Sequence, residues 1–411
     1  MKRILLFLLI VPGYIHSQQS FLINFNAGKY QRDSTPVWVH LPAPAPAAKS
    51  WILIDQKTKR KIPAQLIDSM TLVFIPKEKI PAGTKRTWLL TTVSSLQLKK
   101  PVKIQVQKDG LLVKVNNKPL LLYHTKEAMP PPDSPLYFRR SGFIHPLYSP
   151  SGKILTDDFP VAHIHQHGIF MTWPNTLFRK ELLDFWNQQL QTGTVEHVEI
   201  LKITQGSVVS QLRLKLRHKS LKYGEVLSEI WTLTIYPFTE HFLFDLESEQ
   251  VNTTTDTLFV NTNHYGGLAF RGSKQWNPDD TVNFKKPWQI LTSEGIKDTL
   301  ANATHARWVD ASGEVDGEMN GVTIFNNSSN FRYPQGLRVH PSMPYWAYAP
   351  AVDGAFTLNP GSTYHSEFRY FVHRGKPDTN LIEKLRRDWE NPPLVKVTFI
   401  DRQTSNGKRQ K

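Results

Sequence analysis

Short runs of alternating apolar and polar residues fill the first quarter of the chain. They occur at residues 21–25, 37–41, 51–54, 72–75 and 87–90, with prolines and glycines between them. A period of two places every second side chain on one face, which is the pattern of a half-buried β-strand. We therefore expect residues 18–98 to form a small immunoglobulin-like β-sandwich.

Alternating runs continue in a longer second region, where aromatic, histidine and glycine residues are frequent. The proline-rich segment 129–133 cannot be regular structure, because proline fixes φ and lacks a backbone donor. Strand candidates after it are 195–203, 208–216, 229–236, 241–246, 258–261, 321–325, 345–349 and 364–373. Their number predicts that residues 99–375 form a large two-sheet β-sandwich carrying the functional site.

Helical periodicity is confined to two short segments. Apolar residues recur at helical spacing in 181–191 and again in 379–390. Each segment predicts a short helix that covers a sheet edge. The fold class is therefore all-β with a few short helices, and residues 376–411 are expected to be one such helix and a basic, flexible tail.

The first 17 residues have the pattern of a secretory signal. Lys2 and Arg3 precede an apolar run from Ile4 to Val11, and Ser17 ends a small-residue cleavage site. The run is about half of the roughly 20 residues that a membrane span requires. We expect residues 1–17 to be a signal peptide and the mature protein, without a membrane span, to be periplasmic or extracellular.

Composition then excludes several kinds of chemistry. The chain has no cysteine, which removes disulfides, thiolate metal sites and a cysteine nucleophile. Its formal charge is +15, but lysine and arginine are scattered and no nucleic-acid-binding motif accompanies them. We expect a solvated basic surface and no nucleic-acid partner, with attraction to acidic glycans as the second interpretation.

The densest chemical signal is a row of histidines behind two carboxylates. His163, His165 and His167 follow Asp157 and Asp158 at every second position. On a strand they would share one face, with the outer two about 13 Å apart. Three interpretations remain open: acid–base or ligand-binding chemistry, a structural role, and a divalent metal held by two of the three histidines. The metal would need a remote donor, for which the candidates are Asp157, Asp158, His145 and His264.

Other charged and aromatic residues suit a polar ligand such as a sugar, which presents apolar faces and hydroxyl edges. The substrate-binding candidates are Arg140, His145, His264, Tyr265, Arg271, Trp308, Asp310 and Arg338. Further stacking candidates are Trp173, Trp276 and Trp346. The sequence has no glycine-rich phosphate loop, no Gly-x-Ser-x-Gly elbow and no His-Glu-x-x-His helix.

These residues also carry a family resemblance. The chain resembles exported bacterial proteins labelled methane oxygenase PmoA-like, otherwise a domain of unknown function. The matching stretches are 145–152, 158–160 with 163–168, 265–268 with Arg271, 308–310, and Arg338 with 340–341. The label is not taken literally, because such an oxygenase subunit has several membrane spans and this chain has none after its signal.

The expected architecture is similar to the galactose mutarotase-like supersandwich. That likeness implies a histidine that donates a proton to the ring oxygen and a carboxylate that takes the anomeric proton. Here the row His163, His165 and His167 would supply the acid, and Glu367 or Asp158 the base.

The preferred function is therefore an exported carbohydrate-active or sugar-binding protein that needs no cofactor. The alternatives are a histidine-ligated, metal-dependent enzyme of oxidative or hydrolytic type and a non-catalytic glycan- or partner-binding sandwich.

Overall fold

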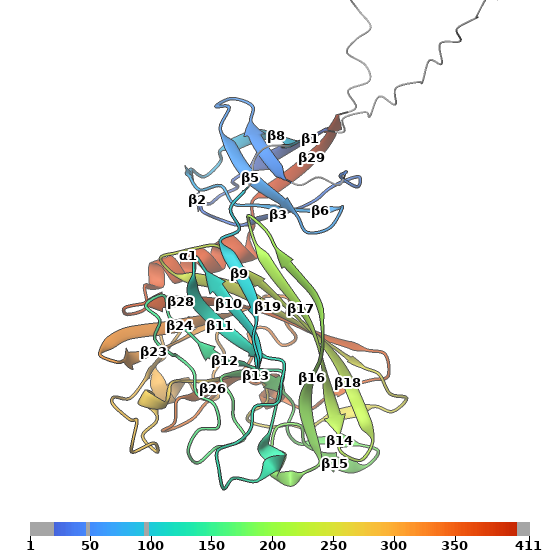
Figure 1. Cartoon of the computed structure of the whole chain (residues 1–411), viewed down its shortest axis with the longest axis vertical. Helices are drawn as coiled ribbons and strands as arrows, with labels where there is room; N and C mark the ends of the chain where they lie inside the picture. The colour runs from blue at the N-terminus through green and yellow to red at the C-terminus, as the bar shows by residue number, and fades with distance from the viewer. Residues whose placement is uncertain (1–19, 47–49, 94–97, 401–411) are drawn as a thin grey trace, which may run out of the picture. The chain divides into compact units, whose positions relative to one another are not determined.

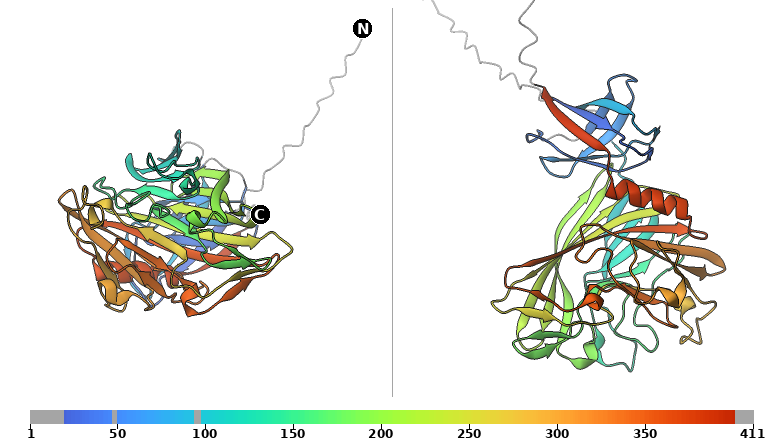
Figure 2. Two further views of the ribbon diagram at one scale, coloured as in Figure 1. Left: turned by 90° about the horizontal axis from the view of Figure 1, so that it is seen from below. Right: turned by 180° about the vertical axis from the view of Figure 1, so that it is seen from behind.

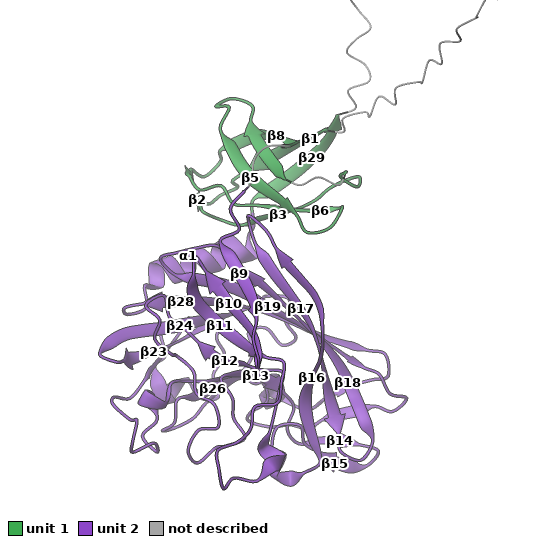
Figure 3. Ribbon diagram, in the orientation of Figure 1, with its two compact units in different colours: residues 1–97, 393–411 green, residues 98–392 purple. Residues whose placement is uncertain are grey.

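The chain forms two compact units in a computed structural model that describes residues 20–46, 50–93 and 98–400. Unit 1 comprises residues 1–97 and 393–411, and unit 2 comprises residues 98–392 (Figure 3). The predicted signal peptide and residues 401–411 lie outside the described residues. Nearly all regular structure is strand, so the predicted all-β fold class is confirmed.

Unit 1 is built on one antiparallel sheet and one core. Phe21, Trp51, Leu72 and Trp88 are fully or almost fully buried there. The order of the sheet is β29 (Leu394–Ile400), β1 (Ser20–Asn26), β8 (Lys85–Thr92), β4 (Trp51–Asp55), β5 (Lys61–Leu66), β6 (Thr71–Phe74), β3 (Val37–His40). A ribbon of β2 (Arg32–Asp33) and β7 (Lys79–Ile80) accompanies it.

One strand of unit 1 comes from the far end of the chain. Residues 394–400, expected to belong to a flexible tail, form β29 and pair antiparallel with β1, Ser20 opposite Ile400. Val395 and Val397 pack against the core of unit 1, because alternate residues of a strand face the same side. The segment is therefore structural up to residue 400.

Unit 2 contains two eight-stranded antiparallel sheets. Sheet I has the order β25 (Leu337–Val339), β26 (Tyr345–Tyr348), β21 (Gly267–Arg271), β13 (Ile169–Thr172), β12 (Ile144–Leu147), β11 (Lys118–His124), β10 (Gly110–Val115), β9 (Val102–Val106). Sheet II has the order β16 (Gly193–Gln205), β17 (Ser210–Ser220), β18 (Gly224–Ile235), β19 (Phe242–Asn252), β28 (Thr363–Arg374), β24 (Glu318–Asn326), β23 (Trp308–Val315), β22 (Gln289–Thr292). A small sheet adds β15 (Glu181–Leu183), β14 (Thr176–Phe178), β20 (Leu258–Val260) and β27 (Phe356–Leu358).

The main core of unit 2 lies between sheets I and II (Figure 1 and Figure 2). Tyr123 of sheet I contacts Trp231 of sheet II with ring centroids 6.0 Å apart. Trp173, just after β13, donates a hydrogen bond of 2.6 Å to Gln250 of sheet II. The predicted large two-sheet sandwich is confirmed, because side chains from both sheets share this core.

Helices are short. Among the described residues there is one α-helix, α1 (Thr379–Glu390), and it has the predicted bounds. Asp378 caps this helix, because its side chain accepts hydrogen bonds from the backbone N–H groups of Asn380 and Leu381. The five 3-10 segments are Leu136–Phe138, Gln188–Leu190, Lys274–Trp276, Asp298–Ala301 and Pro350–Asp353. In the described part of the chain, no helix has the length and apolar character to span a membrane.

The helix expected at residues 181–191 is wrong. The segment forms β15 and then a 3-10 turn, and Leu182 and Leu190 are exposed, so its apolar residues do not form one buried face. Asp184 turns the chain by accepting hydrogen bonds from the backbone N–H groups of Trp186 and Asn187 at 2.8 and 2.7 Å.

Candidate active site

The predicted histidine row lies in a loop rather than on a strand. Residues 157–168, here called the histidine loop, contain turns closed by hydrogen bonds from His163 N to Pro160 O and from Gln166 N to His163 O. Phe159 and Ala162 have left-handed φ values of 50° and 68°, which non-glycine residues rarely adopt. The three imidazoles therefore do not share one strand face.

Both ends of the histidine loop are fixed at Arg271, the last residue of β21. The backbone N–H of Asp157 donates to the Arg271 carbonyl at 3.2 Å, and the Arg271 N–H donates to the Gly168 carbonyl at 2.7 Å. Gly168 itself is needed for close approach, because a Cβ there would lie 2.4 Å from the Ile144 carbonyl oxygen. This pinned, Ω-like loop sits directly against β12 and β21.

At its centre, His167 and Asp158 form a buried dyad. His167 Nδ1 lies 2.5 Å from Asp158 Oδ1, and His167 is 0% exposed. The ring of Phe143 is stacked between His167 and His124, with centroids 4.4 Å from each. His167 Nε2 is buried and has no hydrogen bond of normal geometry among the described residues, while the buried side chain of Gln188 lies near enough to raise the pKa of the ring as a hydrogen-bond contact. A carboxylate thus orients an imidazole whose second nitrogen faces Gln188 without a well-formed hydrogen bond.

Burial sets the protonation of the dyad and its neighbours, because it disfavours charged forms. It raises the pKa of Asp158 to about 6 and lowers the pKa of His167 well below its usual range. Burial likewise lowers the pKa of His145 to about 4. For His165, burial and then the neighbouring His163 and His167 lower the pKa to about 3. These imidazoles are neutral at neutral pH.

Two arginines are buried beside the histidines. Arg140 is 1% exposed, and its Nε, Nη1 and Nη2 have no hydrogen-bond partner among the described residues. Arg271 is 0% exposed; Nη1 contacts Gln166 Oε1 at 3.1 Å, while Nε and Nη2 have no partner. The positive charges of both arginines lower the pKa of His165, after the larger effect of burial. We call Arg140, Asp158, His165, His167 and Arg271 the arginine–histidine cluster.

Aromatic rings connect this cluster to the surface. Phe170 lies 5.3 Å below the Arg140 guanidinium and packs on Trp186 at 4.7 Å. Trp186 in turn contacts Tyr265 at 5.3 Å. Tyr265 and His264 line an open cavity of about 470 Å³. The predicted residues His264 and Tyr265 thus lie on a chain of ring contacts that ends at the cluster.

His145 and Arg338 also lie in this region. His145 Nδ1 contacts Thr156 Oγ1 at 3.0 Å, and the charges of Asp158 and His167 act on its ring. Arg338 donates to Asn302 at 3.2 Å, and its charge lowers the pKa of His264 after the larger effect of burial.

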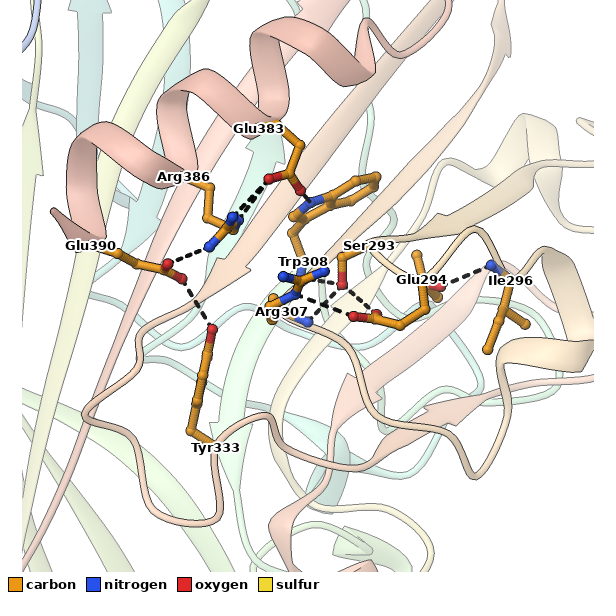
Figure 4. A network of polar contacts seen from close by, with 10 residues as sticks. Ser293, Glu294, Ile296, Arg307, Trp308, Tyr333, Glu383, Arg386 and Glu390 are labelled. Carbon is orange, nitrogen blue, oxygen red and sulfur yellow. Dashed lines mark hydrogen bonds and ion pairs between the residues drawn. The ribbon is translucent and has the colours of Figure 1, made fainter. Parts of the chain in front are cut away.

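Trp308 and Asp310 lie elsewhere, in contrast to their predicted place in the same groove. Their neighbours Val309 and Ala311 belong to the main core, so both side chains face the other side of sheet II. Trp308 donates a hydrogen bond of 2.6 Å to Glu383 of α1 (Figure 4). Asp310 is buried against His373 at 2.9 Å. Both residues hold the packing of sheet II.

The remaining candidates have structural partners too. Glu367 is on β28, where it accepts from Asn327 at 2.9 Å, and burial raises its pKa to about 7. Trp173, Trp276 and Trp346 are at most 1% exposed and belong to the main core, so none offers a face for stacking. Glu367, the other candidate base, therefore lies on sheet II, whereas Asp158 lies in the histidine loop.

The metal interpretation receives no support from the geometry. Within residues 20–46, 50–93 and 98–400, no group of three His, Cys, Asp or Glu side chains could hold an ion. The ring centroids of His163 and His165 are 5.8 Å apart, and His163 is paired with His340 at 5.7 Å. His163, His165 and His167 thus do not converge.

Residues 109–387 match a protein family described only as a family of unknown function, DUF6807. The chain belongs to this family. The matched region includes the histidine loop, Arg140 and Arg271, so the cluster lies within the part that defines the DUF6807 family. No curated protein matches the chain.

Solved structures share only distant similarity with this DUF6807 member. An alpha-mannosidase from Enterococcus faecalis V583 is 10% identical, with 94% of this chain and 46% of that chain covered and a TM-score of 0.43. A GH36 alpha-galactosidase from Geobacillus stearothermophilus is 10% identical, with 69% and 41% covered and a TM-score of 0.32. A galactose mutarotase related enzyme from Lactobacillus acidophilus is 10% identical, with 67% and 95% covered and a TM-score of 0.29. The chain spans about half the length of the first structures it matches.

Sequence reasoning missed several members of the site. His124 ends β11 and stacks on Phe143, and Tyr345 pairs with Arg271 across β26 and β21. Gln188 is buried and donates to the carbonyl of Arg139 at 2.9 Å, which fixes the chain just before Arg140. No local motif marks these residues, because contacts between segments that are distant in the sequence bring them to the site.

Proposed function

We propose that unit 2 of this chain binds a carbohydrate at the arginine–histidine cluster and transfers a proton to or from it. The observation that carries the proposal is the dyad of His167 and Asp158, which leaves Nε2 of His167 buried without a well-formed hydrogen bond. An imidazole oriented by a carboxylate is a recurrent general acid–base arrangement.

The surroundings suit a sugar. The cluster offers buried hydrogen-bond groups without partners on Arg140, Arg271 and Tyr345. Tyr265, which lines the open cavity and contacts the Trp186 ring at 5.3 Å, offers an aromatic ring, whereas Phe170 and Trp186 are buried in the core beside it. Sugar rings need both kinds of contact, hydrogen bonds at their hydroxyl edges and apolar packing on their C–H faces.

The chemistry follows from protonation. Above pH 6 Asp158 is ionised and accepts a hydrogen bond from the N–H at Nδ1 of His167, so Nε2 carries the lone pair. Nε2 then takes a proton from a hydroxyl or C–H group of the bound sugar, and Asp158 stabilises the imidazolium that forms. The neutral state of the histidines makes the dyad a base at neutral pH, which reverses the acid role implied by the mutarotase likeness.

We further propose that the protein is exported. Support comes from the basic and apolar pattern of residues 1–17, from the absence of cysteine, and from the resemblance to exported bacterial proteins labelled PmoA-like.

The test is a screen of mono- and oligosaccharides with the purified chain, in which NMR detects binding, anomeric exchange, epimerisation or cleavage. We expect turnover of at least one sugar, and a loss of about 100-fold or more in His167→Gln. The matched control is His305→Gln, because His305 also pairs with an aspartate, Asp353 at 3.0 Å, but is exposed. Equal turnover in both variants would contradict the role of the dyad.

A further inference from the structure

Arg140 is a buried cation without a bonded counterion. A guanidinium has five N–H donors, yet none of its three nitrogens has a hydrogen-bond partner in the described part of the chain. Its only close stacking contact is the face of Phe170. Burial lowers its pKa only to about 10, so the group is charged at neutral pH. Removing such a charge from water is costly unless an anion or several acceptors compensate it.

The nearby carboxylates do not fill this role. The charges that act on Arg140 are those of Glu229 and then Asp158, and neither carboxylate forms a hydrogen bond with it. Asp158 is already bonded to His167. Glu229 accepts hydrogen bonds from four other side chains: His218, Trp231, Ser248 and Gln250. The donors of Arg140 are thus left for something that is not part of the protein.

Arg271 repeats the arrangement at the end of β21. Its Nε and Nη2 have no hydrogen-bond partner, and neither has the buried hydroxyl of Tyr345, the residue opposite Arg271 on β26. The carboxylate with the largest effect on the pKa of Arg271 is that of Asp157. It accepts a hydrogen bond from the backbone N–H of Asp158 and forms no ion pair with Arg271. Arg140 and Arg271 are therefore two fully buried guanidinium groups with donors that no described residue accepts from, and the charges of both act on His165.

We propose that the ligand of this site is an acidic sugar whose carboxylate binds the Arg140 guanidinium. This inference rests on the proposed carbohydrate function and names its substrate class. A carboxylate matches the planar guanidinium with two parallel hydrogen bonds and supplies the missing negative charge. Arg271 and Tyr345 then bind ring hydroxyls or a second acidic residue of an oligosaccharide.

The experiment compares uronic acids with their methyl esters, because esterification removes the charge and keeps the ring. Glucuronate, galacturonate, their oligosaccharides, the corresponding esters and the neutral hexoses are titrated into the full chain by calorimetry. We expect at least one acid to bind ten or more times more tightly than its ester. This comparison uses the unmodified protein and does not depend on how any variant folds.

Variants then locate the carboxylate. Arg140→Met is expected to weaken binding of that acid at least tenfold, whereas Arg139→Met, a neighbour that is 52% exposed and pairs with Glu127, leaves it unchanged. An acid and its ester that bind equally well would overturn the inference and leave the proposed sugar site standing. Binding of inorganic phosphate in preference to every uronate would also overturn it. Failure of every sugar, charged or neutral, would overturn the proposed function as well.

Discussion

Replacing Arg140 by methionine should stabilise the ligand-free protein. Burial lowers the pKa of Arg140 from its ordinary value to about 10, and that difference corresponds to a penalty of about 3 kcal/mol on the charged form in the folded state. Methionine fills a similar volume, removes the charge and keeps the contact with Phe170. Substituting apolar residues for buried ionic groups stabilises other proteins by about 1 to 4 kcal/mol, so we expect a gain of about 1 to 3 kcal/mol here.

The measurement is chemical unfolding of the intact chain, followed by tryptophan fluorescence and by scanning calorimetry. Because the chain has two compact units, the transition of unit 2 is assigned as the one that shifts on binding of a sugar ligand. Arg139→Met is the control and should change the unfolding free energy by less than about 0.5 kcal/mol. A loss of more than about 1 kcal/mol in Arg140→Met would refute the reasoning, because it would mean that the folded protein compensates the guanidinium by itself.

Four further predictions concern His145, the dyad, Gly168 of the histidine loop, and Trp308 on sheet II. Burial lowers the pKa of His145 from 6.5 to about 4, so between these pH values the unfolded state binds more protons than the folded state. The contribution of His145 to the unfolding free energy is therefore fully present above pH 6.5 and falls by up to about 3 kcal/mol toward pH 4. Calorimetry should find a smaller loss of stability over this pH range in His145→Gln. Asp158→Ala leaves Nδ1 of His167 buried without its partner, which should cost about 1 to 3 kcal/mol in urea unfolding; an unchanged midpoint would argue against the dyad. Gly168→Ala forces a Cβ against a backbone oxygen and should destabilise by about 1 to 3 kcal/mol while weakening sugar binding. Trp308→Phe removes a hydrogen bond to α1 and should cost about 1 kcal/mol with sugar affinity intact; altered affinity would return this face of sheet II to the site.

The strands and α1 were predictable because their signals are local. Period-two alternation identifies β17 and β18, and helical spacing behind Asp378 gives the bounds of α1. The pairing of β29 with β1 was not predictable, since the partners are separated by nearly the whole chain. Local spacing also misled at residues 181–191, where Asp184 bonds to the backbone and turns the chain.

The candidate site was predictable only in its densest segment. The histidine loop, Arg140, Tyr265 and Arg271 could be named as candidates because reactive side chains crowd together in the sequence. Trp308 and Asp310 were wrongly grouped with them, because residue type does not say which face of a sheet a side chain occupies. His124 and Gln188 reach the loop through contacts between distant segments, for which the sequence has no local signal.

On the proposed mechanism, ligand charge and proton transfer are coupled. After burial, the charge of Arg140 is the largest influence that lowers the pKa of His167. A carboxylate bound to Arg140 neutralises that charge, so it raises the pKa of His167 and makes Nε2 a stronger base while the ligand is present. Asp158, ionised above pH 6, then stabilises the imidazolium. An acidic sugar would thus activate the base that acts on it, whereas a neutral sugar would leave His167 a poor proton acceptor even when bound.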